Sequence, residues 1–386
     1  MKIVLTGGGS GGHITPLLAV AHELKRLRPE ARLIYIGQKG DSLGDVPRNS
    51  LDIDEVYSVR AGKFRRYKGH GLKQLLYGST VIKNARDGGR VVLGLAESRR
   101  LLKRLKPDIV FIKGGFVGVP VGLAAAQLKI PYVTHDSDAM PGLANRIIAR
   151  WASVHAVAMP KELYSYPQDK TVTVGVPIGA AFRRVDDKLK AEYKNDLGLS
   201  QYKQIIFVTG GGNGARQLNE IVALSAKQLL QTYQDLAIVH LSGRLLLNDT
   251  VETYKKNLTE EAFARVMVKG FVSDLYRYSG AADLIIGRGS ATNLAEFAVQ
   301  AKPCVIVPAR QLAWTTKNTE ALEREGAVVA LDEESLMRNP NELVETCSRL
   351  LEDHVASAKL SAKLHAKFSL PDAAQKLAQI IIETVS

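Results

Sequence analysis

Residues 1–16 read Met-Lys-Ile-Val-Leu-Thr-Gly-Gly-Gly-Ser-Gly-Gly-His-Ile-Thr-Pro, and this stretch decides the fold. It predicts a short buried strand at 3–5, a glycine-rich turn at 7–12 and a helix that begins near Thr15 and Pro16. Glycines let a backbone approach a ligand closely, and a helix start presents unpaired N–H groups and a positive dipole end. The stretch therefore predicts an anion site, most often for phosphate, although such glycines also occur where a strand and a helix simply pack tightly.

Two further features favour a functional loop. His13 ends the loop, which is an unusual place for a histidine with a purely structural role. Residues 204–219, Gln-Ile-Ile-Phe-Val-Thr-Gly-Gly-Gly-Asn-Gly-Ala-Arg-Gln-Leu-Asn, repeat the strand, the glycine turn and the helix start. We therefore expect two related halves of nucleotide-binding type that face one another.

Length and composition limit the class of protein. A chain of 386 residues exceeds one typical hydrophobic core and suits two domains. Its 46% apolar and 24% charged content is typical of a soluble globular protein. Cys304 and Cys347 form no CxxC pair, which argues against a disulfide scaffold or a zinc site and suits a reducing cytoplasm. With no signal peptide and no apolar run of membrane-spanning length, we expect a soluble or peripheral protein.

The net charge of +13 predicts an acidic partner: nucleic acid, anionic lipid or a phosphorylated substrate. The excess is dense between Arg60 and Lys106, where the acidic residues are Asp87 and Glu97. Apolar residues are interspersed there, and a basic amphipathic surface suits anionic headgroups. Two helices are expected in this region, at 71–82 and 91–105. A solvated helix face is the alternative. Nucleic acid is disfavoured, because no recognisable nucleic-acid-binding module accompanies the charge.

Three loops of the first half follow expected strands, at residues 7–13, 114–118 and 135–145. Ligands of open parallel sheets bind beyond the carboxyl ends of the strands, so we expect these loops to converge on one crevice. Asp136 and Asp138 spell the DxD pattern of metal-dependent sugar-nucleotide enzymes. The favoured interpretation is that the carboxylates cap the loop, as aspartates commonly do.

A second candidate site follows a strand of the other half. The strand ends before Arg288, and residues 290–292 are expected to open a helix whose N–H groups face a diphosphate. Glu296 lies within two turns of that helix start, where a carboxylate can accept both hydroxyls of a ribose. An ordinary helix cap with Glu296 on the surface is the alternative.

Seven motifs in chain order resemble those of the MurG family of glycosyltransferases. They are residues 7–13 with Pro16, 113–120, His135 with 141–145, Gly175 with Pro177, 210–215, His240 with 242–243, and 288–291 with Glu296. The resemblance implies an α/β protein of the GT-B fold, with two Rossmann-like domains whose parallel sheets face one another across a cleft. We expect an acceptor and membrane-binding domain at 1–176 and a UDP-sugar domain at 177–370, and the helix at 371–386 is a candidate to pack on the first.

The resemblance also implies an activity. The family transfers N-acetylglucosamine from UDP-N-acetylglucosamine to the undecaprenyl-diphosphate muramyl-pentapeptide lipid, converting lipid I to lipid II in peptidoglycan synthesis. The reaction inverts the configuration at the anomeric carbon of the sugar and is metal-independent, so neither a cofactor nor a metal is expected. The implied location is peripheral, on the cytoplasmic face of the cell membrane. The implied partners are the lipid-linked substrate and anionic inner-membrane lipids, with cell-wall and division proteins as further candidates and no nucleic acid.

Matching positions imply roles for single residues. His13 is the candidate to deprotonate the acceptor hydroxyl, because an imidazole titrates near the working pH. The acceptor and its diphosphate would be bound by Ser10, Gly11, Gly12, His135 and Asn145. The donor would be bound by Asp138, Gly212, Val272, Arg288, Ser290, Ala291, Thr292, Glu296, Thr316 and Lys317. The membrane-facing patch would contain Phe64, Arg65, Arg66, Tyr67, Lys73, Leu76 and Tyr77.

Four positions depart from the family pattern, and all are expected on the donor side. Asp138 stands for an Asn, Gly212 for a Ser, and Thr316 with Lys317 for a Gln pair; near Gly179 the Arg that usually follows Gly-x-Pro is absent. Either the donor pocket is rebuilt, with Lys317 or Arg310 reaching the sugar or the phosphates, or another UDP-sugar is used.

Other functions stay open. A glycolipid synthase or a non-hydrolysing epimerase would use the same scaffold, but an epimerase leaves the basic amphipathic region unexplained. A binding protein with a decayed donor site is disfavoured by the presence of His13, Arg288 and Glu296. A dehydrogenase is disfavoured because the second strand ends in Gly37 and Gln38, without the acidic residue that binds a ribose.

Overall fold

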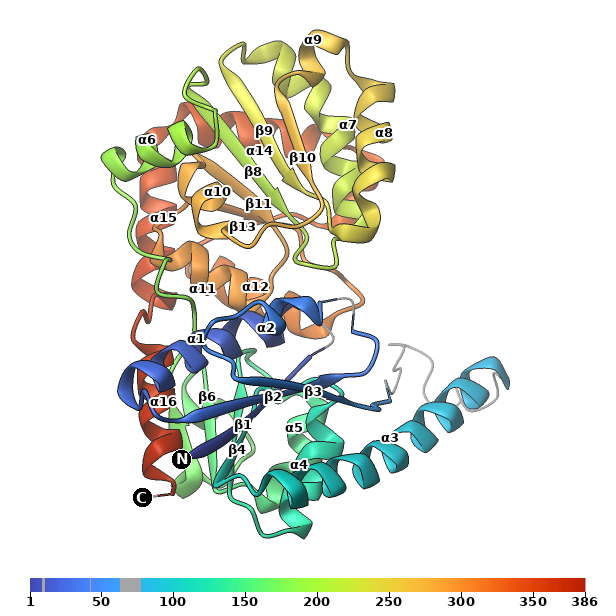
Figure 1. Cartoon of the computed structure of the whole chain (residues 1–386). Coiled ribbons are helices and arrows are strands. Elements are labelled where there is room, and N and C mark those ends of the chain that lie inside the picture. The colour runs from blue at the N-terminus through green and yellow to red at the C-terminus, as the bar shows by residue number, and fades with distance from the viewer. Residues whose placement is uncertain (9–10, 42, 63–77, 386) are drawn as a thin grey trace. The chain divides into compact units, whose positions relative to one another are not determined.

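The computed structural model describes residues 1–8, 11–41, 43–62 and 78–385 (Figure 1). The chain divides into two units. The first contains Met1–Gly179 and Leu370–Ser386, and the second contains Ala180–Ser369. The division therefore falls after Gly179, close to the Gly-x-Pro sequence at 175–177 where a junction was expected, and the chain returns to the first unit at its end.

The first unit is built on a parallel sheet whose described part has seven strands, in the order β3-β2-β1-β4-β5-β6-β7. The strands are β1 (Lys2–Thr6), β2 (Arg32–Gln38), β3 (Glu55–Val59), β4 (Ile109–Ile112), β5 (Tyr132–Asp136), β6 (Val154–Val157) and β7 (Thr171–Thr173). The order reverses between β1 and β4, so the loops after these strands flank the point where such sheets bind ligands.

Helices cover both faces of this sheet (Figure 1). They are α1 (Gly11–Leu27), α2 (Asp45–Arg48), α3 (Gly78–Leu105), α4 (Gly118–Gln127), α5 (Leu143–Ile148) and α16 (Ala373–Glu383), with 3-10 turns at η2 (Ala149–Trp151), η3 (Lys161–Leu163) and η4 (Gln168–Lys170). Ile3 and Leu5 of β1 pack with α1 and α16, whereas Val4 packs with α3 and α4. The strand is apolar throughout because both of its faces are buried.

Two helix predictions for this unit were wrong. The first helix begins at Gly11 rather than near Thr15, so Gly12 and His13 belong to its first turns and Pro16 lies inside it. A proline inside a helix leaves one early carbonyl without its amide partner, and this loss is smallest near the start. The helix expected at 91–105 begins at Gly78 and continues through Gly88 and Gly89, where a break between two helices was expected.

The second unit repeats the plan with strands in the order β10-β9-β8-β11-β12-β13. They are β8 (Gln204–Thr209), β9 (Leu236–Leu241), β10 (Val266–Lys269), β11 (Leu284–Gly287), β12 (Cys304–Ile306) and β13 (Val329–Ala330), all paired in parallel. β8 lies where β1 lies in the first sheet, which confirms the internal repeat. The expected α/β class, with two Rossmann-like domains, is also confirmed.

The helices of the second unit are α6 (Asp187–Asp196), α7 (Arg216–Thr232), α8 (Leu247–Asn257), α9 (Glu260–Phe263), α10 (Leu275–Ala281), α11 (Ala291–Val299), α12 (Ala313–Arg324), α13 (Glu333–Arg338), α14 (Asn341–Glu352) and α15 (His354–Phe368), with a 3-10 turn at η5 (Arg244–Leu246). Ile206 and Val208 of β8 pack with α7 and α14, which form the largest part of this core. In neither unit does a described helix combine the length and apolar character needed to cross a bilayer.

Candidate functional site

The first glycine loop is held at the carboxyl end of β1 by its neighbours in the sheet. The Tyr35 hydroxyl donates a hydrogen bond to the carbonyl oxygen of Gly7, and the Thr6 hydroxyl donates to that of Ile36 at 2.8 Å. A Cβ atom on Gly7 would lie 3.3 Å from both the Lys113 Cβ and the His13 carbonyl oxygen. The loop therefore lies between the ends of β2 and β4, with little room for a side chain.

The loop after β4 meets this glycine loop. Gly114 and Gly115 have φ values of +106° and +79°, which favour glycine. A Cβ atom on Gly115 would lie 2.5 Å from the Gly8 carbonyl oxygen, so no larger residue fits there without movement. A Cβ atom on Gly114 would lie 3.6 Å from the His13 ring and from the Asn145 amide group. The three expected loops thus meet at the carboxyl edge of the first sheet, and the place where they meet is called the crevice below.

His13 lies in the first turns of α1 and is partly buried. Burial and the positive charge of Lys113 lower the pKa of His13 to about 3. This pKa lies well below the near-neutral value expected from the sequence. The imidazole is therefore neutral at physiological pH and keeps a lone pair that can accept a proton. Gly11 and Gly12 form the start of the same helix, whereas Ser10 lies outside the described residues.

His135 and Asn145 belong to the third loop and are both buried. His135 Nε2 donates to the Gly175 carbonyl oxygen at 2.9 Å, and Asn145 Nδ2 donates to the His135 carbonyl oxygen at 2.9 Å. A carbonyl can only accept, so the proton of His135 lies on Nε2 and its Nδ1 is an acceptor. Within the described chain, His135 Nδ1 and Asn145 Oδ1 have no hydrogen-bond partner.

Asp136 caps its own loop, as the sequence predicted. Its two carboxylate oxygens accept hydrogen bonds from the Gly142 amide and the Tyr166 hydroxyl, both at 2.8 Å. Burial raises the pKa of Asp136 above the ordinary aspartate value. Asp138, which was assigned to the donor, lies in the same loop of the first unit, where its backbone oxygen accepts from the Tyr164 hydroxyl at 2.8 Å.

The second glycine loop is fixed by a buried polar network. Gly211 and Gly214 have φ values of +85° and +75°, and a Cβ atom on Gly214 would lie 2.0 Å from the Ser242 carbonyl oxygen. Asn219 donates to that same oxygen at 2.9 Å, and its Oδ1 lies 3.0 Å from His240 Nε2. These contacts explain the motifs at 210–215 and 240–243 as one supported turn. Gly212 lies between the two positive-φ glycines.

The expected helix start after β11 is present. Ser290 caps α11 by accepting from the Asn293 amide at 3.3 Å, and Ala291 and Thr292 are buried in the first turn. Arg288 donates to the Val307 carbonyl oxygen at 2.9 Å and forms an ion pair with the buried Glu333. The Arg288 guanidinium is thus fixed beside the helix start.

Glu296 is buried, with 3% of its surface exposed, so the surface alternative is excluded. Its Oε2 accepts from Asn293 Nδ2 at 3.0 Å. Burial raises the pKa of Glu296 to about 8, because a desolvated carboxylate is disfavoured relative to the neutral acid. The side chain is therefore held next to the start of α11, where a hydrogen bond from a ribose hydroxyl would stabilise the desolvated carboxylate.

Helix α12 packs against the turn at Gly289. A Cβ atom on Gly289 would lie 2.3 Å from the Thr319 Oγ1, and Asn318 donates to the Gly289 carbonyl oxygen at 3.1 Å. On this helix Thr316 is partly buried and Lys317 is exposed. Val272, between β10 and α10, is also partly buried. These three predicted donor residues all belong to the second unit.

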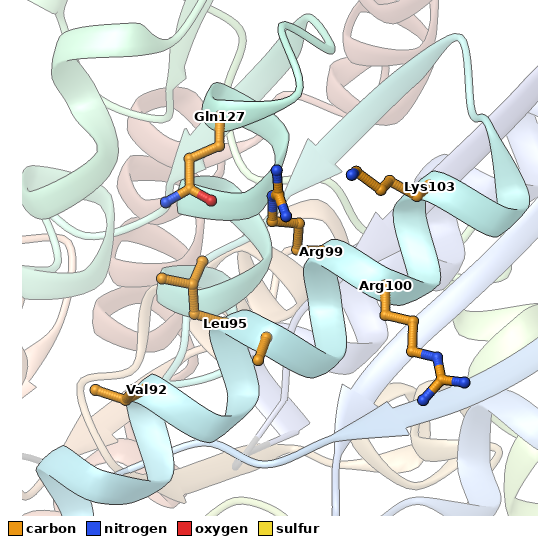
Figure 2. Close-up of a pocket in the computed structure, with 7 residues that line it drawn as sticks. Val92, Leu95, Arg99, Arg100, Lys103 and Gln127 are labelled. Atoms are coloured by element: carbon orange, nitrogen blue, oxygen red, sulfur yellow. The ribbon is translucent and has the colours of Figure 1, made fainter.

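The expected membrane patch, from Phe64, Arg65, Arg66 and Tyr67 to Lys73, Leu76 and Tyr77, lies outside the described residues. The described part of the basic region continues on α3 (Figure 2). A surface depression of about 450 Å³ is lined there by Val92, Leu95, Ala96, Arg99, Arg100, Lys103 and Gln127. Val92 is 67% exposed and the adjacent Leu93 is 52% exposed. Apolar and basic side chains thus share one exposed surface.

Several residues of these sites were not identified from the sequence. Tyr35 supports the first glycine loop from β2, and Glu333 fixes Arg288 from the start of α13. Lys113 follows β4 directly and is 4% exposed. Its place in a recognised motif was a signal, but a lysine after a strand is usually exposed, and nothing in the local sequence indicates its burial.

Comparisons with known proteins agree with this architecture. The glycosyltransferase family 28 N-terminal domain matches residues 3–157, and the family 28 C-terminal domain matches residues 205–377. The UDP-N-acetylglucosamine--N-acetylmuramyl-(pentapeptide) pyrophosphoryl-undecaprenol N-acetylglucosamine transferase of Desulfitobacterium hafniense (strain Y51) is 32% identical, covering 100% of this chain and 99% of the relative. The transferase of the same name from Bacillus cytotoxicus is 29% identical over 99% of this chain and 98% of its own.

Solved structures share the fold. The crystal structure of Acinetobacter baumannii MurG aligns with a TM-score of 0.67 and 22% identity over 99% of each chain. The UDP-GlcNAc 2-epimerase from Neisseria meningitidis aligns equally well, with a TM-score of 0.67 and 14% identity over 99% of this chain and 100% of its own. The fold alone therefore does not separate transferases from epimerases. Because a full-length relative is 32% identical and both halves match family 28 domains, the chain belongs to glycosyltransferase family 28 and, within it, to the MurG family.

Proposed function

We propose that this chain transfers N-acetylglucosamine from UDP-N-acetylglucosamine to N-acetylmuramyl-(pentapeptide) pyrophosphoryl-undecaprenol, the reaction named for its full-length relatives. One observation carries the proposal. In the first unit, His13 and Asn145 lie where the glycine loop after β1 meets the glycines after β4. This crevice combines a neutral base with a helix start, which together suit a hydroxyl nucleophile attached to a diphosphate.

In the proposed reaction His13 acts as the general base. Its neutral imidazole takes the proton of the acceptor hydroxyl, and the hydroxyl oxygen forms a bond to the anomeric carbon while the bond from that carbon to UDP breaks. The configuration inverts in this single displacement, and the proton remains on His13. A general base of this kind contributes about 10²- to 10⁴-fold to the rate.

The donor is assigned to the second unit. The N–H groups at the start of α11 and the Arg288 guanidinium stabilise the negative charge of the departing UDP, so we propose that no metal ion is required. Glu296 binds the ribose, and the backbone near Val272 binds the uracil. The altered residues Asp138, Gly212, Thr316 and Lys317 bear on which sugar is transferred, so a panel of UDP-sugars tests this part of the proposal.

We also place the protein on the cytoplasmic face of the cell membrane as a peripheral protein. The support is the exposed surface of α3, where Val92 and Leu93 lie close in sequence to Arg99, Arg100 and Lys103. Basic side chains beside apolar ones favour anionic lipid surfaces. Sedimentation with vesicles should therefore increase with the fraction of anionic lipid and decrease with salt, and equal sedimentation with neutral vesicles would contradict this location.

The reaction is tested by separating transfer from epimerisation. The purified chain is incubated with UDP-N-acetylglucosamine, with and without the muramyl-pentapeptide diphospholipid. We expect the nucleotide sugar to be consumed only when the lipid is present, with one N-acetylhexosamine added per lipid. Formation of a 2-epimer without lipid would instead assign the chain the reaction of the structurally similar epimerases.

A further inference from the structure

Lys113 occupies a position in the first unit that the proposed reaction has not yet used. Its backbone amide continues the sheet by donating to the Thr6 carbonyl oxygen at 2.9 Å. Its side chain is 4% exposed, and its Cβ lies beside the glycine loop, 3.3 Å from where a Gly7 Cβ would be. The ammonium group is therefore held inside the crevice rather than on the surface.

The charge of Lys113 acts on each titratable group of the crevice. Burial, followed by this charge, lowers the pKa of His13 and of His135. Burial also lowers the pKa of Lys113, and the carboxylates of Asp138 and Asp136 oppose that shift. Yet in the described part of the chain the Lys113 ammonium forms no hydrogen bond and no ion pair. An ammonium in this position, without a hydrogen-bonded partner among the described residues, is available to an anion from outside the chain.

The start of α1 indicates which kind of anion suits Lys113. This helix begins at Gly11 in the loop that Lys113 adjoins, and its first N–H groups and positive dipole end favour a phosphate or a diphosphate. His135 Nδ1 and Asn145 Oδ1 also lack a partner among the described residues, but both atoms are closed to solvent and do not identify the ligand.

We propose that Lys113 binds the diphosphate of the acceptor substrate, and that Asp138 is its counter-charge in the loop after β5. The inference rests on the proposed transfer reaction and adds a residue to its acceptor site. Asp138 stands where the MurG resemblance expects an asparagine. A lysine and an aspartate therefore occur as a pair in this crevice, and the aspartate belongs with the acceptor rather than the donor.

The test is steady-state kinetics of the full chain with Lys113→Met, which keeps the length and apolar stem of the side chain. Losing a charge-assisted hydrogen bond should raise the KM for the lipid acceptor about 10- to 100-fold. The KM for UDP-N-acetylglucosamine should stay unchanged, and this excludes the donor as the source of the diphosphate. Lys113→Arg should recover part of the lost affinity. Lys188→Met, at an exposed lysine of α6, removes the same charge and should change neither constant.

A double variant separates anion binding from simple neutralisation of Asp138. If Lys113 only balanced Asp138, Lys113→Met combined with Asp138→Asn would restore the acceptor KM. We expect the KM to stay high in the double variant, because the anion still lacks its cation. The thermal midpoint of Lys113→Met is measured in parallel, because removing one member of the pair with Asp138 can by itself lower stability. A lower midpoint with an unchanged acceptor KM would assign Lys113 a structural role and overturn the inference.

A binding measurement keeps this inference distinct from the proposed function. Inorganic diphosphate is titrated into the wild type and Lys113→Met without other substrates. Binding lost in the variant, with no transfer to any acceptor, would retain Lys113 as an anion site and reject the transferase. Transfer by the wild type with an unchanged acceptor KM in Lys113→Met would reject Lys113 and retain the transferase.

Discussion

His13 is the residue on which the proposed chemistry depends, and its surroundings determine its protonation. Burial and the charge of Lys113 lower the pKa of His13 to about 3, so the free protein holds it as a base. A bound diphosphate adds negative charge and raises this pKa again. The free enzyme and the substrate complex should therefore titrate differently.

The pH dependence of kcat/KM reports the free enzyme. A base is active above its pKa, so a lowered pKa moves the loss of activity to more acidic pH. We expect kcat/KM to stay nearly constant as the pH falls from ~7 to ~5, where an ordinary histidine would already be protonated. His13→Ala should lower kcat roughly 10²- to 10⁴-fold while leaving UDP binding unchanged. An acidic limb centred near the ordinary histidine value would show that His13 is not in this environment.

The pKa of Glu296 is shifted in the opposite direction to that of His13. Burial raises its pKa from 4.5 to about 8, so the folded state favours the neutral acid. The neutral Glu296 side chain contributes to the free energy of unfolding. This contribution is fully present below pH 4.5, the pKa of the unfolded chain, and is lost as the pH rises through about 8, the pKa of the folded chain. Glu296→Gln should therefore be more stable than the wild type at pH ~8 and similar at pH ~4.5. The same substitution should weaken binding of UDP-N-acetylglucosamine, because the amide accepts hydrogen bonds less strongly.

Chemical denaturation at pH ~8 and ~4.5 measures the difference in stability between Glu296→Gln and the wild type. Isothermal titration measures the loss of affinity for UDP-N-acetylglucosamine. Asn293 can still donate to the glutamine oxygen, so a large loss of stability at both pH values is not expected. A stability difference independent of pH would mean that Glu296 does not titrate in this range.

The contact between the loops after β1 and β4 depends on glycines as well as on side chains. Gly115 combines a φ of +79° with a Cβ position 2.5 Å from the Gly8 carbonyl oxygen. Gly88 lies inside α3, and among the described residues no atom outside its own helix backbone lies within 4 Å of its Cβ position. One glycine is required by its contacts, whereas the other is merely tolerated.

Gly115→Ala should separate the two loops of the acceptor crevice. We expect a loss of about 1–3 kcal/mol in the free energy of unfolding and a marked fall in transfer activity. The matched control Gly88→Ala should gain about 0.5–1 kcal/mol, because alanine favours a helix, and should keep full activity. Equal effects of the two substitutions on stability and turnover would refute the assigned contact between the loops.

The elements that the sequence predicts well are those with a strong local pattern. Apolar strands such as β1 and β8, and the helix start at Ser290, agree with expectation because buried parallel strands and helix caps depend on neighbouring residues. The uninterrupted α3 was missed because two adjacent glycines resemble a break, while its packing through Leu101 and Leu102 on the sheet overrides that preference.

The candidate sites divide in the same way. His13 and Asn145 were found because their loops follow strands, and the carboxyl ends of parallel strands share one edge of a sheet. Lys113 and Glu333 were missed because their roles arise from contacts with distant parts of the chain. The burial of Lys113 depends on its contact with Gly7, more than a hundred residues earlier, so it cannot be predicted from the residues around Lys113.

For the whole chain, the last helix is the feature that links the two ends of the sequence. Leu377, Ile381 and Ile382 of α16 pack with Leu17 and Leu24 of α1, so the first unit is complete only when the second has been synthesised. The placement of this helix, left open by the sequence, thus follows from its apolar face.

Ile381→Ala should destabilise the first unit specifically. Truncating a fully buried isoleucine costs about 2–5 kcal/mol, which should lower the melting transition of the first unit and leave that of the second unchanged. Calorimetry resolves the two transitions, and Val355→Ala, at a 79% exposed position of α15, is the control. A drop in the second transition alone would contradict the assignment of α16.

The most direct measurement is mass spectrometry of the lipid product, with the wild-type chain supplied with the muramyl-pentapeptide diphospholipid and a panel of UDP-sugars. We expect the lipid to gain a single N-acetylhexosamine, from UDP-N-acetylglucosamine alone, in the absence of added metal. His13→Ala, measured in parallel, should give little product. Transfer of a different sugar would mean that Gly212, Thr316 and Lys317 re-specify the donor, and no transfer from any donor would contradict the proposed function.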